Sequence, residues 1–418
     1  MSFQLLRRVR RVMVVGLILT VLGNRLIEGG WNALTAAGQV SVGTFVLISS
    51  AEQLCVFAFP LYAHILKKYS PDTTLITIDF VETILSVIAV IALMFTGIPQ
   101  MWLLVGYIAI DLFLAPVSDI AEEFYGAAFA QQSEEHALSF NAALYAWLGF
   151  IGLVVASPAG AWISVLSVQV LFVANAVLSL AGASFRMWAR HTYAMPALID
   201  ADDDEFSVTG TRLPIRQFFF DLFRSGPASP LLSFVLQVIG ALTGSLVFLW
   251  AANLSERPAQ IAMGWVLIAF GSAATVGPLV GRRISKAVPT KRALQATAGL
   301  STLNIVIAVV LIASNNATFY TAIGFIFCNV LFNKARVIIL ETHRQVFFRG
   351  SQFARIMSWS YSFGAIGTIC GLQLGYLLNT PNSPLSALLI AATLWVVVAG
   401  VVSSRTSQTP NAPATPRT

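Results

Sequence analysis

The chain has few charged residues and few cysteines. Only 11% of its 418 residues are charged, against roughly 25% in soluble domains, while 57% are hydrophobic. A soluble core could not bury this much apolar surface, so the lipid bilayer is the expected solvent. The three cysteines, Cys55, Cys328 and Cys370, fall in three different apolar segments and give no indication of a disulfide.

The motifs of enzymes and ATP-driven pumps are also missing. The four histidines are scattered without metal-ligand spacing, and no glycine-rich phosphate loop with its lysine is present. We therefore predict no catalytic residues, no metal and no cofactor, and we do not expect an enzyme. The net charge of +6 is explained by membrane topology, so nucleic-acid binding is not expected.

Long apolar segments are abundant. A membrane span needs roughly 20 apolar residues, and it must be helical because lipid offers no hydrogen-bond partners to the backbone. The sequence predicts an all-α polytopic membrane protein with twelve transmembrane helices, over residues 12–36, 40–66, 73–96, 100–118, 137–162, 165–186, 228–252, 259–281, 290–313, 317–341, 353–378 and 383–403.

Basic residues predict the orientation of these spans. All of the 25 Lys and Arg residues except Arg25 and Arg257 lie at span ends or connections that would share one side of the membrane. Cytoplasmic loops carry such an excess. Both termini are therefore predicted to be cytoplasmic, in the plasma membrane and most simply the bacterial inner membrane.

The chain divides into two similar halves. Residues 187–227 form the only long connection and contain an acidic run, which separates a six-helix bundle at 1–186 from a second at 228–404, followed by a polar, disordered tail at 405–418. Spans five and eleven carry small residues at the same spacing, which allows a second helix to approach closely. The predicted helix-packing residues are Gly149, Gly152, Pro158 and Gly160 in span five, and Gly364, Gly367, Gly371 and Gly375 in span eleven.

Twelve spans, cytoplasmic termini, a long charged central connection and paired halves resemble the major facilitator superfamily. The superfamily has a sequence signature between spans two and three, and only its terminal basic pair, Lys67 and Lys68, is clearly present in this chain. The segment 152–160, with Ser157 and Pro158, is similar to a motif of proton-coupled exporters, and segments 25–29 and 78–82 resemble the drug and siderophore efflux branch. The resemblance implies two pseudo-symmetric six-helix bundles. It also implies a monomeric, proton-coupled exporter (an antiporter) of a drug-like molecule or a secreted metabolite such as a siderophore, working by alternating access.

Charged residues inside the spans are candidates for function, because a charge at the bilayer centre costs at least about 2.5–3.5 kcal/mol. By analogy with the resembled fold, Arg25, Glu28, Glu52 and Asp111 are candidates for proton coupling or substrate binding. A static salt bridge between Arg25 and Glu28 is the alternative. Asp79 and Glu82 fall in an outer span and are predicted to brace helices as structural charges.

The second half is basic and polar. Asn329, Asn333 and Arg336 share one helix face and are candidates to line a substrate cavity, which would suit an anionic or zwitterionic substrate. The alternative for Arg336 is that it extends to the cytoplasmic interface. Three aromatic residues, Tyr145, Trp147 and Tyr361, are further cavity candidates, with ordinary packing as the alternative.

Two other functions remain open from the sequence. The same fold supports an uptake symporter or uniporter for a small nutrient, because alternating access is reversible. A membrane sensor that transports nothing is the third reading, and the charges inside the membrane argue against it.

Overall fold

The computed structural model is all-helical. It describes residues 3–58, 69–132, 147–193, 229–347, 350–379 and 383–404. The side chains of residues 3–10, 119–120, 122–132, 148, 230, 245, 285–286, 290, 341–347, 350–359 and 400–404 are outside this description. Most of the predicted central connection and the whole predicted tail also lie outside it.

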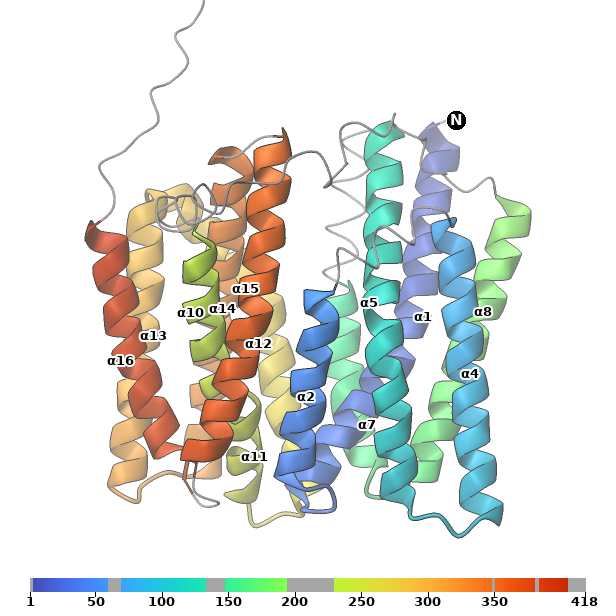
Figure 1. The fold of residues 1–418 in the computed structure, drawn as a ribbon, viewed down its shortest axis with the longest axis horizontal. Helices are drawn as coiled ribbons and strands as arrows, with labels where there is room; N and C mark the ends of the chain where they lie inside the picture. The colour runs from blue at the N-terminus through green and yellow to red at the C-terminus, as the bar shows by residue number, and fades with distance from the viewer. Residues whose placement is uncertain are drawn as a thin grey trace, which may run out of the picture.

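The first half forms one group of helices, drawn in blue to green in Figure 1. Its helices are α1 (Phe3–Ala36), α2 (Val42–Phe57), α4 (Pro71–Phe95), α5 (Gln100–Gln132), the π-helix η1 (Leu148–Ala156) with its continuation α7 (Ser157–Ile163), and α8 (Val168–Thr192).

The second half forms a neighbouring group, drawn in yellow-green to red in Figure 1. Its helices are α10 (Pro230–Leu242) and α11 (Ser245–Asn253), α12 (Ala259–Ala287), α13 (Thr290–Ala313), α14 (Phe319–Phe347), α15 (Gly350–Leu378) and α16 (Leu385–Ser404).

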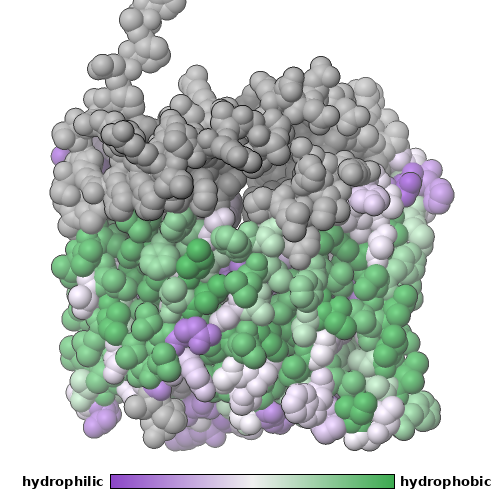
Figure 2. All heavy atoms as spheres, in the orientation of Figure 1, coloured by the Kyte–Doolittle hydropathy of each residue, from purple (hydrophilic) through white to green (hydrophobic). Residues whose placement is uncertain are grey.

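The predicted fold class is confirmed. Each of the twelve predicted spans corresponds to one helix or to two helices placed end to end. Among the described residues, nine helices are long and apolar enough to cross a membrane, and three shorter apolar helices cover 42–57, 149–163 and 385–399. Figure 2 shows hydrophobic residues covering the middle of one face, as a lipid-facing belt requires. The protein is a multi-pass membrane protein.

Two predicted spans are irregular, which hydropathy did not indicate. The described part of span five, from residue 147 onward, contains the π-helix η1, and span seven breaks between Leu242 and Ser245. Thr243 ends α10 and hydrogen-bonds the carbonyl of Ile239 at 2.8 Å through its own hydroxyl. Interruptions of this kind mark positions where a membrane helix bends or where polar groups are exposed inside the bilayer.

Five short connections lie at the same end of the molecule, whereas the connection 288–289 between α12 and α13 lies at the other end. The connections 37–41, 96–99, 164–167, 254–258 and 314–318 are at the end opposite the N-terminus, which we call the short-loop end (Figure 1). Gly38 and Gly97 take positive φ angles of 73° and 64° in two of these turns, a conformation that side chains disfavour. These tight turns hold consecutive helices antiparallel and adjacent.

Candidate functional site

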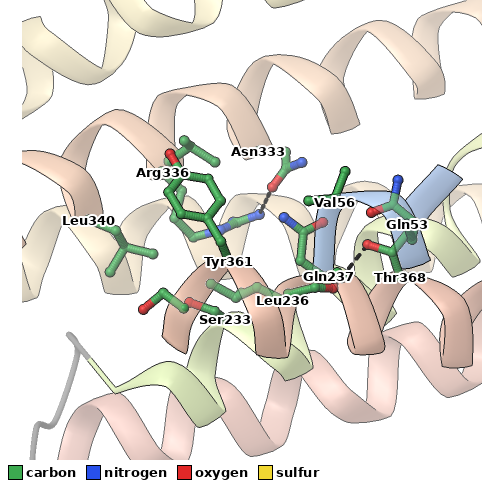
Figure 3. Close-up of a pocket in the computed structure, with 14 residues that line it drawn as sticks. Gln53, Val56, Ser233, Leu236, Gln237, Asn333, Arg336, Leu340, Tyr361 and Thr368 are labelled. Atoms are coloured by element: carbon green, nitrogen blue, oxygen red, sulfur yellow. Dashed lines mark hydrogen bonds between the residues drawn. The ribbon is translucent and has the colours of Figure 1, made fainter. Parts of the chain in front are cut away.

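A cavity of about 320 Å³ lies between the two halves. Figure 3 shows its lining side chains. The first half contributes Gln53 and Val56 from α2, and the second half supplies the rest, which are Ser233, Leu236 and Gln237 from α10, Asn333, Arg336, Val337 and Leu340 from α14, and Ser360, Tyr361, Gly364, Ala365 and Thr368 from α15. Its volume is at the lower end of the range for small-ligand pockets. Amide and hydroxyl groups share its wall with aliphatic side chains, so it suits a partly polar small molecule.

Arg336 is the charged residue of this lining. Its Nη2 donates to Asn333 Oδ1 at 3.0 Å and its Nη1 donates to Ser301 Oγ at 3.2 Å. The guanidinium carbon lies 4.0 Å from the centroid of the Trp395 ring, a cation–π contact. The residue is only 4% exposed, and its Nε has no hydrogen-bond partner among the described residues. Arg336 therefore lies inside the bundle and does not extend to the interface.

The other predicted cavity residues are placed differently. Asn329 does not line the cavity, and its amide instead donates to Thr243 Oγ1 at 3.0 Å, at the break in span seven. Trp147 is exposed and does not line the cavity, whereas Tyr361 lines it. Tyr145 lies outside the described residues.

Contacts between the halves run from the short-loop end to the middle of the helices, where Gly271 of α12 packs against the Leu153 main chain of η1. Trp162 of α7 donates from Nε1 to the carbonyl oxygen of Ile261 on α12 at 3.4 Å, and its ring lies edge-on to Trp265 with centroids 5.9 Å apart. Nearer the middle, Gln373 of α15 donates to Ser50 Oγ of α2 at 3.0 Å. These contacts join the two bundles on the side of the cavity that faces the short loops.

The small residues of span five meet α1 backbone to backbone. A Cβ atom at Gly160 would collide with the main-chain oxygen of Leu26, and one at Gly29 would collide with that of Ser157. Gly152 faces the aliphatic part of Arg25, and the Ser157 N–H bonds Gly152 O in the i→i+5 pattern of the π-helix. Large side chains here would separate the two helices.

The small residues of span eleven meet α10 in the same way. A Cβ at Gly367 would collide with the main-chain oxygen of Phe234, and one at Gly371 would crowd Val238. Gly364 faces Gln237 in ordinary contact. Spans one and five, and spans seven and eleven, are thus packed by equivalent surfaces in the two halves.

A buried ion pair holds three helices of the first half together. Asp79 of α4 is fully buried and pairs with Arg186 Nη1 of α8 at 2.8 Å. Thr20 of α1 donates to Asp79 Oδ1 at 2.8 Å, and Arg186 Nη2 donates to the carbonyl of Gly16 at 3.2 Å. The charge pattern of the sequence predicts Arg186 at the membrane edge, and this prediction is wrong. The helix continues to Thr192, so this residue is buried within the bundle.

A second set of polar contacts lies one turn further along α4. Glu82 is 1% exposed and accepts hydrogen bonds from Asn24 and Ser179, both at 3.1 Å. Asn175 of α8 donates to Ser86 Oγ at 2.9 Å and to the Tyr107 hydroxyl at 2.6 Å.

Sequence reasoning missed these partners of Asp79 and Glu82. A signal was available on α8, where Asn175, Ser179, Gly182 and Arg186 are spaced by four, three and four residues and so form one small or polar face.

The four candidates for proton coupling do not line the cavity. Arg25 and Glu28 form an ion pair with both side chains partly exposed, at 41% and 46%. Glu52 is exposed beside the cavity residue Gln53. Asp111 of α5 is half-buried and interacts electrostatically with Glu82, so it belongs to the polar interior of the first half. Within the described residues, no three His, Cys, Asp or Glu side chains form a metal-binding group.

No protein-family model matches the chain, and no curated protein matches its sequence. Solved structures do match. A bacterial homologue of the iron transporter ferroportin in its inward-facing state has a TM-score of 0.68 at 12% identity, over 98% of this chain and 100% of that one. Its outward-facing state has a TM-score of 0.63 at 14% identity, over 96% of this chain and 100% of that one.

The nucleoside transporter NupG matches with a TM-score of 0.66 at 14% identity, over 96% of this chain and 100% of that chain. At such low identity these similarities show the fold. Membership of the efflux branch remains a prediction. The chain has the major facilitator fold over nearly its whole length.

Proposed function

We propose that the protein is a secondary active transporter that carries a small molecule through the cavity by alternating access. One observation carries the proposal: a partly polar cavity, lined from both halves, lies within a pair of bundles that have the major facilitator fold. A scaffold has little use for buried polar surface of this kind, because polar groups inside a membrane protein are costly.

The packing supports two units that move relative to each other. The stripes of small residues hold α1 against η1 and α7 in one half and α10 against α15 in the other. The two halves also meet closely, since a Cβ at Gly271 of α12 would collide with the main-chain oxygen of Leu153. The contacts of Trp162 and of Ser50 with Gln373 would have to separate when the short-loop end opens. We therefore propose residues 1–186 and 228–404 as the two moving bundles, joined by the connection at 187–227.

We propose that substrate export is coupled to the movement of protons in the opposite direction. Glu28 is a partly exposed carboxylate in the middle of an apolar helix, which is tolerated only where water or protein surrounds it. Asp111 of α5 interacts electrostatically with the buried Glu82 of α4, and two like charges in a poorly solvated interior repel each other, so proton gain or loss at Asp111 would change the interaction between these two helices. Glu52 is exposed and directly precedes the cavity residue Gln53 in the sequence. A drug-like molecule or a secreted metabolite such as a siderophore is the proposed substrate class.

Transport assays test this proposal. The full chain is reconstituted in liposomes and offered a panel of metabolites, antibiotics and siderophores, with and without an imposed pH gradient. We expect a substrate to accumulate against its gradient when the proton gradient is present. Glu28→Gln and Asp111→Asn should abolish this response while leaving substrate exchange without a gradient intact. Glu256→Gln, in a short connection, is the control.

The outcomes separate the alternatives. Coupled accumulation driven in the opposite direction would identify an uptake symporter, and movement without any gradient response would identify a uniporter. If both carboxylate variants retain full coupling, the proposed coupling residues are wrong. If no compound moves while one still binds, the protein is a sensor and transport itself is refuted.

A further inference from the structure

Two arginines are buried among the described residues, and their surroundings differ. Arg186 is 5% exposed and Arg336 is 4% exposed. Arg186 faces the Asp79 carboxylate at 2.8 Å, so its charge is neutralised within the bundle. Among the described side chains, no carboxylate lies within ion-pair distance of Arg336. The second arginine therefore keeps a positive charge that its described neighbours do not compensate.

The neighbours of Arg336 orient the guanidinium without neutralising it. They are the amide oxygen of Asn333, the hydroxyl of Ser301 and the face of the Trp395 ring, all of them uncharged. These contacts hold the planar group in one orientation. An unpaired charge in a poorly solvated interior is costly, so a residue of this kind is expected where a ligand supplies the opposite charge.

The cavity beside Arg336 is suited to such a ligand. The arginine lines it, and its Nε remains a hydrogen-bond donor without a partner in the described part of the chain (Figure 3). Gln53, Gln237 and Thr368 add neutral polar groups, while Leu236 and Leu340 add apolar wall. Arginine presents a planar fork of donors that matches the oxygens of a carboxylate or a phosphate.

We infer that the cavity binds a small organic oxyanion, a carboxylate or a phosphate monoester with a partly apolar body, and that Arg336 anchors its charged group. The inference rests on the proposed transport function, whose substrate class it narrows. It gives α14 the role of recognising charge and α10 and α15 the role of recognising the uncharged body. Tyr361 provides a ring against which a flat body can stack.

Three probe compounds that share the same apolar group test this inference. Phenyl phosphate, benzoate and benzyl alcohol share a benzene ring and differ in the group that would meet Arg336. Binding of each to the purified full chain is measured by isothermal titration calorimetry. We expect at least one of the two anions to bind at least about tenfold more tightly than the alcohol. The anion that binds more tightly identifies the phosphate or the carboxylate class. Equal affinity for all three, or no binding of either anion, would overturn the inference.

Variants tie the effect to the arginine. Arg336→Gln should remove the preference for the anion, and Arg336→Lys should restore part of it, because an ammonium keeps the charge without the planar fork. Arg190→Gln is the matched control, since this arginine is half-exposed and remote from the cavity lining. A preference for the anion that survives in Arg336→Gln would overturn the inference.

The stability of the ligand-free protein tests independently whether Arg336 has an acidic partner inside the protein. If Arg336 is unpaired, Arg336→Gln should unfold no more readily than wild type, because it removes an uncompensated charge. Glu341 is an acidic residue of the same helix and serves as the test for an internal ion pair. A marked loss of stability in Arg336→Gln that Glu341→Gln relieves in the double variant would show an internal ion pair and overturn the inference.

The two proposals can fail separately. Anion binding through Arg336 without transport of any compound would leave this inference standing and refute the transport function. Transport of neutral compounds that is unchanged in Arg336→Gln would refute the inference alone.

Discussion

Replacing Asp79 by asparagine should destabilise the first bundle strongly. The carboxylate and the Arg186 guanidinium are 2.8 Å apart, with side chains 0% and 6% exposed. With an effective dielectric constant of about 20, two unit charges at this distance attract by about 6 kcal/mol, before the cost of removing them from water is subtracted. Removing one partner of a buried pair leaves the other uncompensated and typically costs about 3–5 kcal/mol. We expect Asp79→Asn to lower the free energy of unfolding by about this amount.

A neighbouring pair supplies the control. Arg190 lies one turn beyond Arg186 on α8 and pairs with Asp72 at 3.3 Å, but its side chain is 52% exposed. In a water-like dielectric the attraction at this distance is only about 1 kcal/mol, and exposed pairs contribute about 0–1 kcal/mol net. Arg190→Met should therefore change the stability little.

Equilibrium unfolding in mixed detergent micelles measures both effects. The double variant Asp79→Asn/Arg186→Met should be more stable than the sum of the single variants predicts, because it removes both charges of the pair. The reasoning is refuted if Asp79→Asn costs less than about 1 kcal/mol, or if Arg190→Met is equally destabilising.

Two further predictions concern helix contacts. Gly160→Leu should destabilise the protein by about 1–3 kcal/mol or more, because its side chain would displace the Leu26 main chain. Gly324→Ala, with no atom within 4 Å of its added Cβ, should not destabilise the protein and should stabilise α14 by up to about 1 kcal/mol. Equal effects of both would contradict the packing described. Trp162→Ala should open the short-loop end by removing the hydrogen bond to the α12 main chain and the contact with Trp265. The distance between spin labels on α7 and α12 should then lengthen or broaden, and an unchanged distance distribution would show that this contact does not hold the two bundles together.

The number and type of the helices could be predicted from the sequence because insertion into lipid is decided segment by segment. Each apolar stretch near 20 residues must be helical whatever its neighbours do. The irregularities could not be predicted in this way. The π-helix before Ser157 and the break after Leu242 lie in segments whose hydropathy is that of ordinary spans, and they depend on which backbones pack there.

The candidate site was partly predictable. The spacing of Asn333 and Arg336 places them on one face of α14, and the structure joins them by a hydrogen bond beside the cavity. The spacing could not show that Asn329 would hydrogen-bond Thr243, or that Asp111 would interact with Glu82 and not line the cavity. The rotation of each helix about its axis decides such contacts, and that rotation is fixed by packing between distant segments.

The sequence by itself determined that the chain lives in a bilayer, that it forms twelve helical spans, and that small residues recur at equivalent places in spans five and eleven. These properties can be read from single segments, because hydropathy and helical spacing depend on the residues of one segment and not on the helices packed against it. Only the tertiary structure decided which buried charges are paired. Arg186 meets Asp79 across 107 residues, while Arg336 has no acid beside it among the described side chains, because ion pairing depends on which helix faces come together.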